Sequence, residues 1–263
     1  MLLIDTHCHL QDSEFYTDEQ REELYRCAVA ADTSMICVGT DVRSSREAVA
    51  FARTHERCYA VVGIHPHEAE SNSVKDIAAL LHTHNKEGES RIVGIGEIGL
   101  DYHYDGSTPE MQQQILNDQI QLALEYDLPI SFHVRDAFDA FWPIFDRFSG
   151  VRGVLHSFTD SPENLQRGIE NGLFVGINGI STFTRDEAQR YMYSHVPLEH
   201  VVLETDAPFL TPKPFRGKIN TPAYVRYVAE DQATCKGVSV EHVAAITTRN
   251  AITLFRLDYE RTR

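Results

Sequence analysis

Hydrophobic residues along this chain gather into short runs rich in valine, isoleucine and leucine, and each run is followed by a stretch with helical periodicity. Such runs predict β-strands, whereas apolar residues recurring every three or four positions predict amphipathic helices. Eight runs alternate with helical stretches along the chain. The predicted strands are Leu2–Leu10, Met35–Thr40, Cys58–Ile64, Ile92–Leu100, Pro129–Val134, Gly153–Phe158, Leu173–Asn178 and Val201–Asp206.

The predicted helices are clearest at Asp18–Ala31, near Ser45–His55 and at about Pro109–Tyr126. Asp160-Ser161-Pro162 predicts another helix start, because proline is favoured in the first helical turn. The segment from Pro222 to about Leu254 predicts two further helices, which we expect to cover the barrel after the last strand.

Strict alternation of strands and helices is typical of a parallel sheet. A chain of 263 residues with eight such units matches the length of a closed barrel. We therefore expect an α/β fold, a (β/α)8 TIM barrel formed by residues 1–263 as a single domain. An open, doubly wound sheet is the alternative architecture.

Composition and charge narrow the classes of function. The chain is 42% hydrophobic and 24% charged, which is typical of a globular protein. Its formal net charge of −15 argues against a broad basic surface for nucleic acid, so a substrate with phosphates needs local contacts. No apolar run reaches the roughly 20 residues of a membrane span, and no signal-peptide pattern opens the chain.

The cysteines are odd in number and form no Cys-x-x-Cys pair. This usage indicates buried structural thiols in a reducing compartment, and with the missing signal pattern it predicts a cytoplasmic protein. The five are Cys8, Cys27, Cys37, Cys58 and Cys235.

Candidate metal ligands lie in the predicted strands, most of them at the carboxyl ends. His7 and His9 stand two residues apart at the end of the first strand, so their side chains share a face while Cys8 points the other way. In a parallel barrel the carboxyl ends of all strands ring one mouth, where barrel enzymes keep their active sites. The residues expected to meet there as metal ligands are His7, His9, Glu97, His133, His156 and Asp206.

Six such ligands are more than one open tetrahedral ion uses, so they predict two divalent ions. Glu97 is the candidate bridge, because a carboxylate can bind two ions at once. Two ions about 3.5–4 Å apart activate a shared water for hydrolysis. Asp206 is placed to take the proton from that water, so Glu97 and Asp206 are the expected catalytic residues.

Several motifs resemble those of TatD-family metal-dependent deoxyribonucleases in the amidohydrolase superfamily, and they cover essentially the whole chain. The matching strings are Asp5-Thr6-His7-Cys8-His9-Leu10, Gly63-Ile64-His65-Pro66-His67, Gly96-Glu97-Ile98-Gly99-Leu100-Asp101-Tyr102, His133-Val134-Arg135-Asp136-Ala137, Leu155-His156-Ser157-Phe158, Glu204-Thr205-Asp206-Ala207-Pro208-Phe209-Leu210, Pro212 through Lys218, and Asn250 through Phe255.

The resemblance implies a (β/α)8 barrel, divalent metal and hydrolysis of DNA phosphodiesters, commonly from the 3′ end. It also implies two ligand sets, which share Glu97. The chain departs from the family at His103, where relatives often have another aromatic residue, and at Asn178, where many have serine. The first implied set is His7, His9, Glu97 and Asp206, and the second is Glu97, His133 and His156.

Substrate contacts are predicted from residues that follow strands, with surface ion pairing or loop packing as the alternative. Arginine and lysine bind phosphates as bidentate or point donors. Glu204 shares a face with Asp206 and is expected to orient ligands or waters. Phe158 and Phe209 are interpreted as barrel packing, with stacking on a base as the alternative. The predicted substrate-binding residues are His65, His67, Arg135, Arg216 and Lys218.

The leading hypothesis is therefore a deoxyribonuclease, a 3′–5′ exonuclease with DNA as its substrate and two ions of Mg²⁺, Mn²⁺ or Zn²⁺ as cofactors. The alternatives are an amidohydrolase or esterase of small molecules, an aminoacyl-tRNA deacylase using the same centre, or a metal-loaded scaffold without activity. Glu97 stands where a carboxylated lysine would favour the small-molecule branch. The sequence indicates no membrane association and no obligate protein partner.

Overall fold

Eight parallel strands run in sequence order around the molecule, so that each strand pairs with the next one along the chain. The computed structural model describes residues 1–86, 91–104 and 106–258. This order is that of a (β/α)8 barrel, and it excludes the doubly wound alternative. The strands are β1 (Leu3–Cys8), β2 (Thr33–Val38), β3 (Cys58–Val62), β4 (Ile92–Asp101), β5 (Ile130–Arg135), β6 (Gly153–Leu155), β7 (Phe174–Ile177) and β8 (Val201–Leu203).

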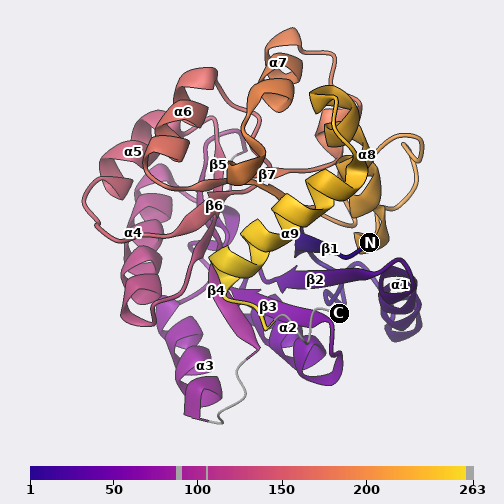
Figure 1. The fold of residues 1–263 in the computed structure, drawn as a ribbon. Coiled ribbons are helices and arrows are strands. Elements are labelled where there is room, and N and C mark those ends of the chain that lie inside the picture. The colour runs from indigo at the N-terminus through magenta and orange to yellow at the C-terminus, as the bar shows by residue number, and fades with distance from the viewer. Residues whose placement is uncertain (87–90, 105, 259–263) are drawn as a thin grey trace.

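Helices follow the strands and surround the barrel (Figure 1). Ser161 caps one of them as its sequence predicts, accepting a hydrogen bond from the Asn164 N–H at 3.2 Å. The α-helices are α1 (Asp18–Ala30), α2 (Val42–Thr54), α3 (Val74–Lys86), α4 (Pro109–Glu125), α5 (Phe138–Phe145), α6 (Pro162–Glu170), α7 (Glu187–His195), α8 (Val225–Lys236) and α9 (Val240–Phe255), and short 3-10 turns are η1 (Pro66–Glu68), η2 (Gly179–Thr182), η3 (Leu198–His200) and η4 (Pro222–Tyr224).

Side chains close the barrel between β1 and β8. The carboxylate of Asp5 accepts hydrogen bonds from the Thr205 N–H at 2.8 Å and from the Thr205 hydroxyl at 2.6 Å. We call this contact between β1 and β8 the seam. Main-chain hydrogen bonds continue the seam toward the mouth of the barrel: the N–H of Asp206 donates to the carbonyl of His7, and the N–H of His9 donates to the carbonyl of Ala207, both at 2.8 Å. The seam therefore fixes Asp206 directly beside the two histidines of β1.

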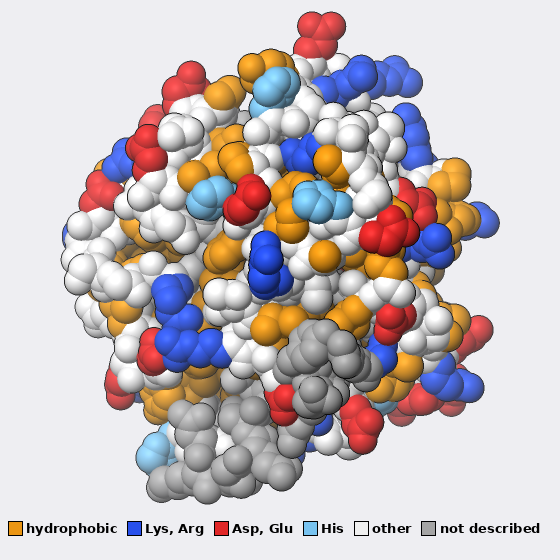
Figure 2. All heavy atoms as spheres, in the orientation of Figure 1, with side chains coloured by type: hydrophobic (Ala, Val, Ile, Leu, Met, Phe, Trp, Pro, Cys, Tyr) orange, Lys and Arg blue, Asp and Glu red, His pale blue; other side chains and the backbone are white. Residues whose placement is uncertain are grey.

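Helix α9 closes the opposite end of the barrel. Its buried residues Leu254 and Phe255 pack with Ile4 and Val61 from inside the barrel, and the Asn250 side chain donates to the carbonyl of Val201 at 2.8 Å. Figure 1 shows α9 crossing in front of the strands, and Figure 2 shows acidic, basic and hydrophobic side chains intermixed on this face. The predicted final helices are confirmed as α8 and α9.

Three expectations need correction. The predicted helix near Ser45 begins earlier, at Val42, because Asp41 caps it by accepting the Ser44 N–H. His156 lies just beyond β6, and Asp206 lies three residues beyond β8. Ser157 and Asp206 adopt left-handed backbone, with φ of 48° and 58°, which keeps both residues out of an extended strand.

The prediction that all five cysteines are buried is also wrong in part. Cys8, Cys37 and Cys58 are buried among the barrel strands, but Cys27 and Cys235 are exposed on the helices α1 and α8. All five are free thiols. In the described part of the chain, no helix combines the length and apolarity that crossing a membrane requires.

The seam makes a testable prediction about stability. Thr205→Val keeps the shape of the side chain but leaves the buried Asp5 carboxylate without its 2.6 Å hydroxyl donor. We expect the free energy of unfolding to fall by about 1–3 kcal/mol, measured by urea denaturation. Thr253→Val is the control, because the exposed Thr253 hydroxyl bonds within its own helix, and a change within about 0.5 kcal/mol is expected there. Equal losses in the two variants would contradict the role of the seam.

Candidate metal centre and active site

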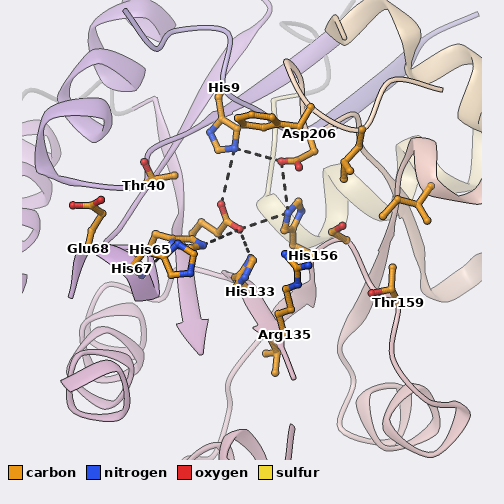
Figure 3. Close-up of a pocket in the computed structure, with 16 residues that line it drawn as sticks. His9, Thr40, His65, His67, Glu68, His133, Arg135, His156, Thr159 and Asp206 are labelled. Atoms are coloured by element: carbon orange, nitrogen blue, oxygen red, sulfur yellow. Dashed lines mark hydrogen bonds and ion pairs between the residues drawn. The ribbon is translucent and has the colours of Figure 1, made fainter. Parts of the chain in front are cut away.

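A cavity of about 470 Å³ lies at the carboxyl end of the barrel (Figure 3). Its walls are formed by residues of the strands and of the loops that follow them, as expected for this fold. The predicted residues that line it include ligand candidates and substrate candidates alike. They are His9, His65, His67, Glu97, His133, Arg135, His156 and Asp206.

The Glu97 carboxylate lies buried at the centre of the cluster, and its two oxygens face different histidines. Oε2 lies 3.4 Å from Nε2 of His7 and 4.0 Å from Nε2 of His9. Oε1 lies 2.7 Å from Nδ1 of His133 and 3.6 Å from Nε2 of His156. A carboxylate between two pairs of imidazoles has the arrangement of a bridging ligand.

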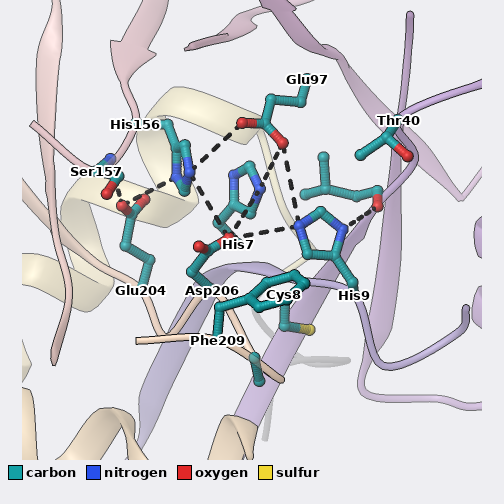
Figure 4. A network of polar contacts seen from close by, with 12 residues as sticks. His7, Cys8, His9, Thr40, Glu97, His156, Ser157, Glu204, Asp206 and Phe209 are labelled. Carbon is teal, nitrogen blue, oxygen red and sulfur yellow. Dashed lines mark hydrogen bonds and ion pairs between the residues drawn. The ribbon is translucent and has the colours of Figure 1, made fainter. Parts of the chain in front are cut away.

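Asp206 faces the same cluster from the β8 side (Figure 4). Its Oδ1 lies 3.4 Å from Nε2 of His9, 3.7 Å from Nε2 of His156 and 3.8 Å from Nε2 of His7. The left-handed backbone at Asp206 is one that aspartate tolerates better than most residues. Asp206 therefore joins the imidazoles of β1 to that of the β6 loop.

The two histidines of β1 are oriented from behind, as their spacing predicts. Nδ1 of His9 donates to the carbonyl oxygen of Val38 at 2.8 Å, and Nδ1 of His7 lies 3.2 Å from the Ser131 hydroxyl. Cys8 points away and donates its thiol to a carbonyl of β2. A proton on the outer nitrogen leaves the inner nitrogen, Nε2, with a lone pair for a metal.

Carboxylates orient the other two histidines. Nε2 of His133 lies 3.0 Å from Oδ2 of Asp101, and Nδ1 of His156 lies 3.0 Å from Oε1 of Glu204. The expected role of Glu204 thus has a contact to support it. Glycine at position 176 makes room, because a Cβ there would stand 2.3 Å from Oε2 of Glu204. Both inner nitrogens are left to face Glu97.

His65 differs from these four histidines in the direction of its hydrogen bond. Its Nδ1 accepts the main-chain N–H of His67 at 3.2 Å, so in the neutral ring the proton sits on Nε2. Burial and the nearby His133 lower the pKa of His65 to about 3, which keeps the ring neutral. Nε2 lies 3.9 Å from Oε1 of Glu97. His65 therefore presents a hydrogen-bond donor to the cavity, although its position is close enough for a ligand.

Donor atoms in the cluster are spaced for metal binding. Nε2 of His7 is buried and has no hydrogen-bond partner, which is costly unless an ion takes its lone pair. Atoms within 4.8 Å of one another form four groups in the described residues. These groups are His7–His156–Asp206, His7–His9–Glu97, His65–Glu97–His133 and His65–His67–Asp101. The donor set thus fits divalent metal at the predicted place.

Electrostatics favour cations in the cluster. Burial opposes ionisation of Glu97 and Asp206, but the surrounding histidines lower the pKa of both. Burial also opposes protonation of the histidines, yet hydrogen bonds to Asp101 and Glu97 raise the pKa of His133 to about 9. The charges of Glu204 and Glu97 raise the pKa of His156 to about 10. In the metal-free protein, protons therefore occupy nitrogens that a metal would need.

The predicted basic residues lie in different surroundings. Arg135 lines the cavity, and its guanidinium lies 4.9 Å from the centroid of the Tyr104 ring. Arg216 and Lys218 do not line this cavity. The guanidinium of Arg216 lies 3.8 Å from the centroid of the Phe183 ring. The structure thus brings Arg135, but not the other two, to the candidate ligands.

Sequence reasoning missed two features of the site. Asp101 was not singled out, although it shares a strand face with Glu97 at an even spacing, a signal that was present in the sequence. Phe158 is buried as predicted, with 3% of its surface exposed, but the packing interpretation is wrong for Phe209, which is 46% exposed and lines the cavity.

His103, where the chain departs from the family pattern, lies at the exposed rim, and its ring forms a hydrogen bond with the Asp136 carboxylate.

A parallel barrel with imidazoles and carboxylates gathered at its mouth is an arrangement that metal-dependent hydrolases use. The model of the family TatD related DNase matches residues 4–256. The chain therefore belongs to this family, and it is a metal-dependent hydrolase that acts on ester bonds.

Individual relatives match over nearly their whole length. The chain is 36% identical over 261 residues to the uncharacterized metal-dependent hydrolase YabD of Bacillus subtilis, covering 98% of this chain and 100% of the relative. It is 33% identical to the 3′-5′ ssDNA/RNA exonuclease TatD of Salmonella typhimurium, covering 97% and 99%. The crystal structure of YJJV, a TatD homolog from Escherichia coli, matches with a TM-score of 0.88 and 29% identity, covering 97% and 98%.

The raised pKa values predict how pH changes the stability of the metal-free protein. Because His133 and His156 titrate near pH 9 and 10 when folded, against 6.5 ordinarily, their protonation stabilises the fold. This contribution is complete below about pH 6.5 and is lost as the pH rises through 9 to 10.

We expect the melting temperature of chelator-treated protein to fall between pH 6.5 and 10. Zn²⁺-loaded protein should lose less stability across this range, because the metal replaces the protons. Differential scanning calorimetry of both forms measures the difference. Parallel curves for the two forms would contradict this account of the cluster.

Proposed function

We propose that this hydrolase is a nuclease that removes nucleotides from the 3′ end of DNA, using two divalent ions bridged by Glu97. The observation that carries the proposal is that the two oxygens of this buried carboxylate face different pairs of the candidate ligand histidines, His7 and His9 at one and His133 and His156 at the other. The Salmonella relative is a 3′-5′ ssDNA/RNA exonuclease, which supports the substrate class.

The proposed ligand assignment follows the family motifs, and the contacts of Glu97 support it. His156 lies between Oε1 of Glu97 and Oδ1 of Asp206, at 3.6 and 3.7 Å, so it belongs beside both carboxylates. When bound, the ions would supply Lewis acidity and lower the pKa of water. We propose His7, His9, Glu97 and Asp206 for one ion and Glu97, His133 and His156 for the other. The spacing of donor atoms alone would group His156 with His7 and Asp206 instead.

The choice of metal is part of the proposal. Imidazole ligands suit Zn²⁺, whereas Mg²⁺ and Mn²⁺ accept carboxylate and water readily. Four imidazoles and two carboxylates make a mixed donor set, so Zn²⁺ and Mn²⁺ fit it better than Mg²⁺.

Asp206 is the proposed general base. The surrounding histidines hold its pKa below the usual range against the effect of burial, so the carboxylate is ionised and able to accept a proton at neutral pH. Its place at the cavity wall lets it accept a proton from an attacking water within hydrogen-bond reach.

His65 and Arg135 are the proposed contacts to the scissile phosphate. Nε2 of His65 offers a fixed N–H beside Glu97, and Arg135 lines the same cavity with a cation. His67 donates its main-chain N–H to His65, which holds that ring in the donor form. A neutral donor adds no charge next to the metal ligands, so it polarises a phosphate oxygen without competing for their carboxylates.

The compartment proposed is the cytoplasm. Cys8, Cys37 and Cys58 remain free thiols although they lie buried on adjacent strands, and such thiols persist in reducing surroundings.

The direct test of function is a time course on single-stranded DNA oligonucleotides labelled at the 3′ or the 5′ end, with Mg²⁺, Mn²⁺ or Zn²⁺. We expect immediate release of labelled mononucleotide from the 3′-labelled strand and a descending ladder from the 5′-labelled strand, both abolished by chelator. Intact DNA under all three metals would overturn the nuclease proposal and direct attention to carbonyl substrates.

Asp206→Asn and Glu97→Gln should each abolish turnover while the barrel remains folded. Asp136→Asn is a matched control, because Asp136 has the same left-handed backbone, with φ of 52°, but bonds to His103 at the exposed rim. We expect kcat to fall at least about 10³-fold for Asp206→Asn and to change less than about twofold for Asp136→Asn. Circular dichroism verifies folding, and near-normal activity in Asp206→Asn would refute the assignment.

His65→Gln and His133→Gln should fail in different ways. Removing the His65 donor should lower kcat/KM by about 10²-fold with metal content unchanged, because the ring presents N–H to the cavity. Removing His133 should lower metal content, since its Nδ1 faces Glu97 at 2.7 Å. Mass spectrometry of bound metal, beside steady-state kinetics, separates the two. Loss of an ion from His65→Gln would show that His65 is a ligand.

A further inference from the structure

Two phenylalanines lie exposed and in mutual contact beside the proposed metal centre. Phe209 is 46% exposed and Phe15 is 44% exposed, and their ring centroids lie 5.2 Å apart at an interplanar angle of 86°. Large apolar side chains are usually buried, so a pair exposed together indicates an interaction surface.

The pair is placed against the reacting centre. Phe209 lines the cavity, and its ring centroid lies 6.3 Å from that of His9. Figure 4 shows the Phe209 ring next to Asp206 and His9. A phosphate bound at the metal centre therefore brings its attached nucleotide within reach of this ring.

Hydrogen bonds hold Phe209 in position. Its N–H donates to the Asp206 carbonyl at 2.8 Å. The buried Asn220 side chain donates to the Phe209 carbonyl at 2.6 Å and to the Thr205 carbonyl at 2.8 Å. Phe209 is thus held by the same β1–β8 seam that positions Asp206, the proposed general base.

The loop that carries Phe15 also contacts Asn220. The N–H of Phe15 donates to the carbonyl of Asp12 at 3.2 Å. The neighbouring Tyr16 is buried, and its hydroxyl lies 3.5 Å from the Asn220 carbonyl. A platform fixed in this way loses little conformational freedom when a flat ligand covers it.

The other exposed aromatic rings among the described residues have partners that already occupy a face. Tyr104, at the opposite rim, lies under the Arg135 guanidinium at 4.9 Å. Tyr191 is stacked on His195 at 3.8 Å. Phe209 instead meets Phe15 and His9 by edge-type contacts, at 86° and 66°.

We propose that Phe209 and Phe15 form a nucleobase-binding subsite, on which the base next to the scissile phosphate stacks. This inference rests on the proposed nuclease function and deepens it. The flat apolar face of a base suits such a ring, and stacking is tolerant of base identity. A base inside a duplex is covered by its neighbours, so the subsite selects frayed or single-stranded ends.

The first experiment compares normal single-stranded DNA with the same oligonucleotide carrying abasic sites at its last two 3′ positions. On normal DNA we expect Phe209→Ala to raise KM by about 5- to 150-fold, the range that loss of one stacking contact produces. On abasic DNA the variant and the wild type should have equal KM. Phe209→Tyr should retain the wild-type KM, and Tyr191→Ala should leave both substrates unaffected.

Two results would overturn the subsite. One is an unchanged KM for Phe209→Ala on normal DNA, and the other is an equal loss on both substrates. Bound metal is measured in parallel, so that damage to the neighbouring His9 is detected as lost metal. Phe15→Ala provides a second variant, farther from the ligands, and a smaller rise in KM is expected for it.

A binding measurement separates failure of the subsite from failure of the proposed function. A phosphorothioate-linked oligonucleotide with 2-aminopurine at its 3′ end is titrated with protein and Mn²⁺. Stacking should quench the fluorescence in the wild type and not in Phe209→Ala. Quenching without cleavage of any DNA would support the subsite and refute the nuclease. Cleavage without quenching would support the nuclease and refute the subsite.

Discussion

The carboxylate of Glu97 is the group on which the site depends. It is buried in the barrel, and its ion-pair partners in the described part of the chain are all histidines. A buried charge without compensation is very costly, so Glu97 requires either protonated imidazoles or metal beside it. In the metal-free protein, protonated histidines compensate the charge of Glu97. A metal ion must displace these protons in order to bind, so metal binding depends on pH.

The surrounding structure serves to keep those imidazoles in one chemical form. Val38, Asp101 and Glu204 each hold the outer nitrogen of one proposed ligand, so the inner nitrogens converge on Glu97. The same reasoning separates His65, whose outer nitrogen accepts a hydrogen bond. Distances alone would group His65 with the proposed ligands, whereas the direction of its bond supports the proposed contact with the substrate.

Much of this could be predicted from the sequence, because strand and helix periodicity fixes the order of a parallel barrel, and that order brings strand ends together. The positions of His7 and Asp206 at the mouth of the barrel follow from this reasoning alone. The orientation of His65 was not predicted, because it depends on a short local cap: His65 stands at the N-cap of η1 and accepts the N–H of His67, and strand and helix periodicity does not reveal so short a turn. Phe209 could not be predicted as exposed, because its loop is held by Asn220, eleven residues away along the chain.

The most direct measurement of the central claim is anomalous X-ray scattering from crystals of the protein grown with Mn²⁺. The account predicts two peaks, one beside each oxygen of Glu97, with His133 contacting one ion and His9 the other. A single peak that leaves one of these oxygens without an ion, or a peak held by His65, His67 and Asp101 instead, would contradict a centre bridged by Glu97.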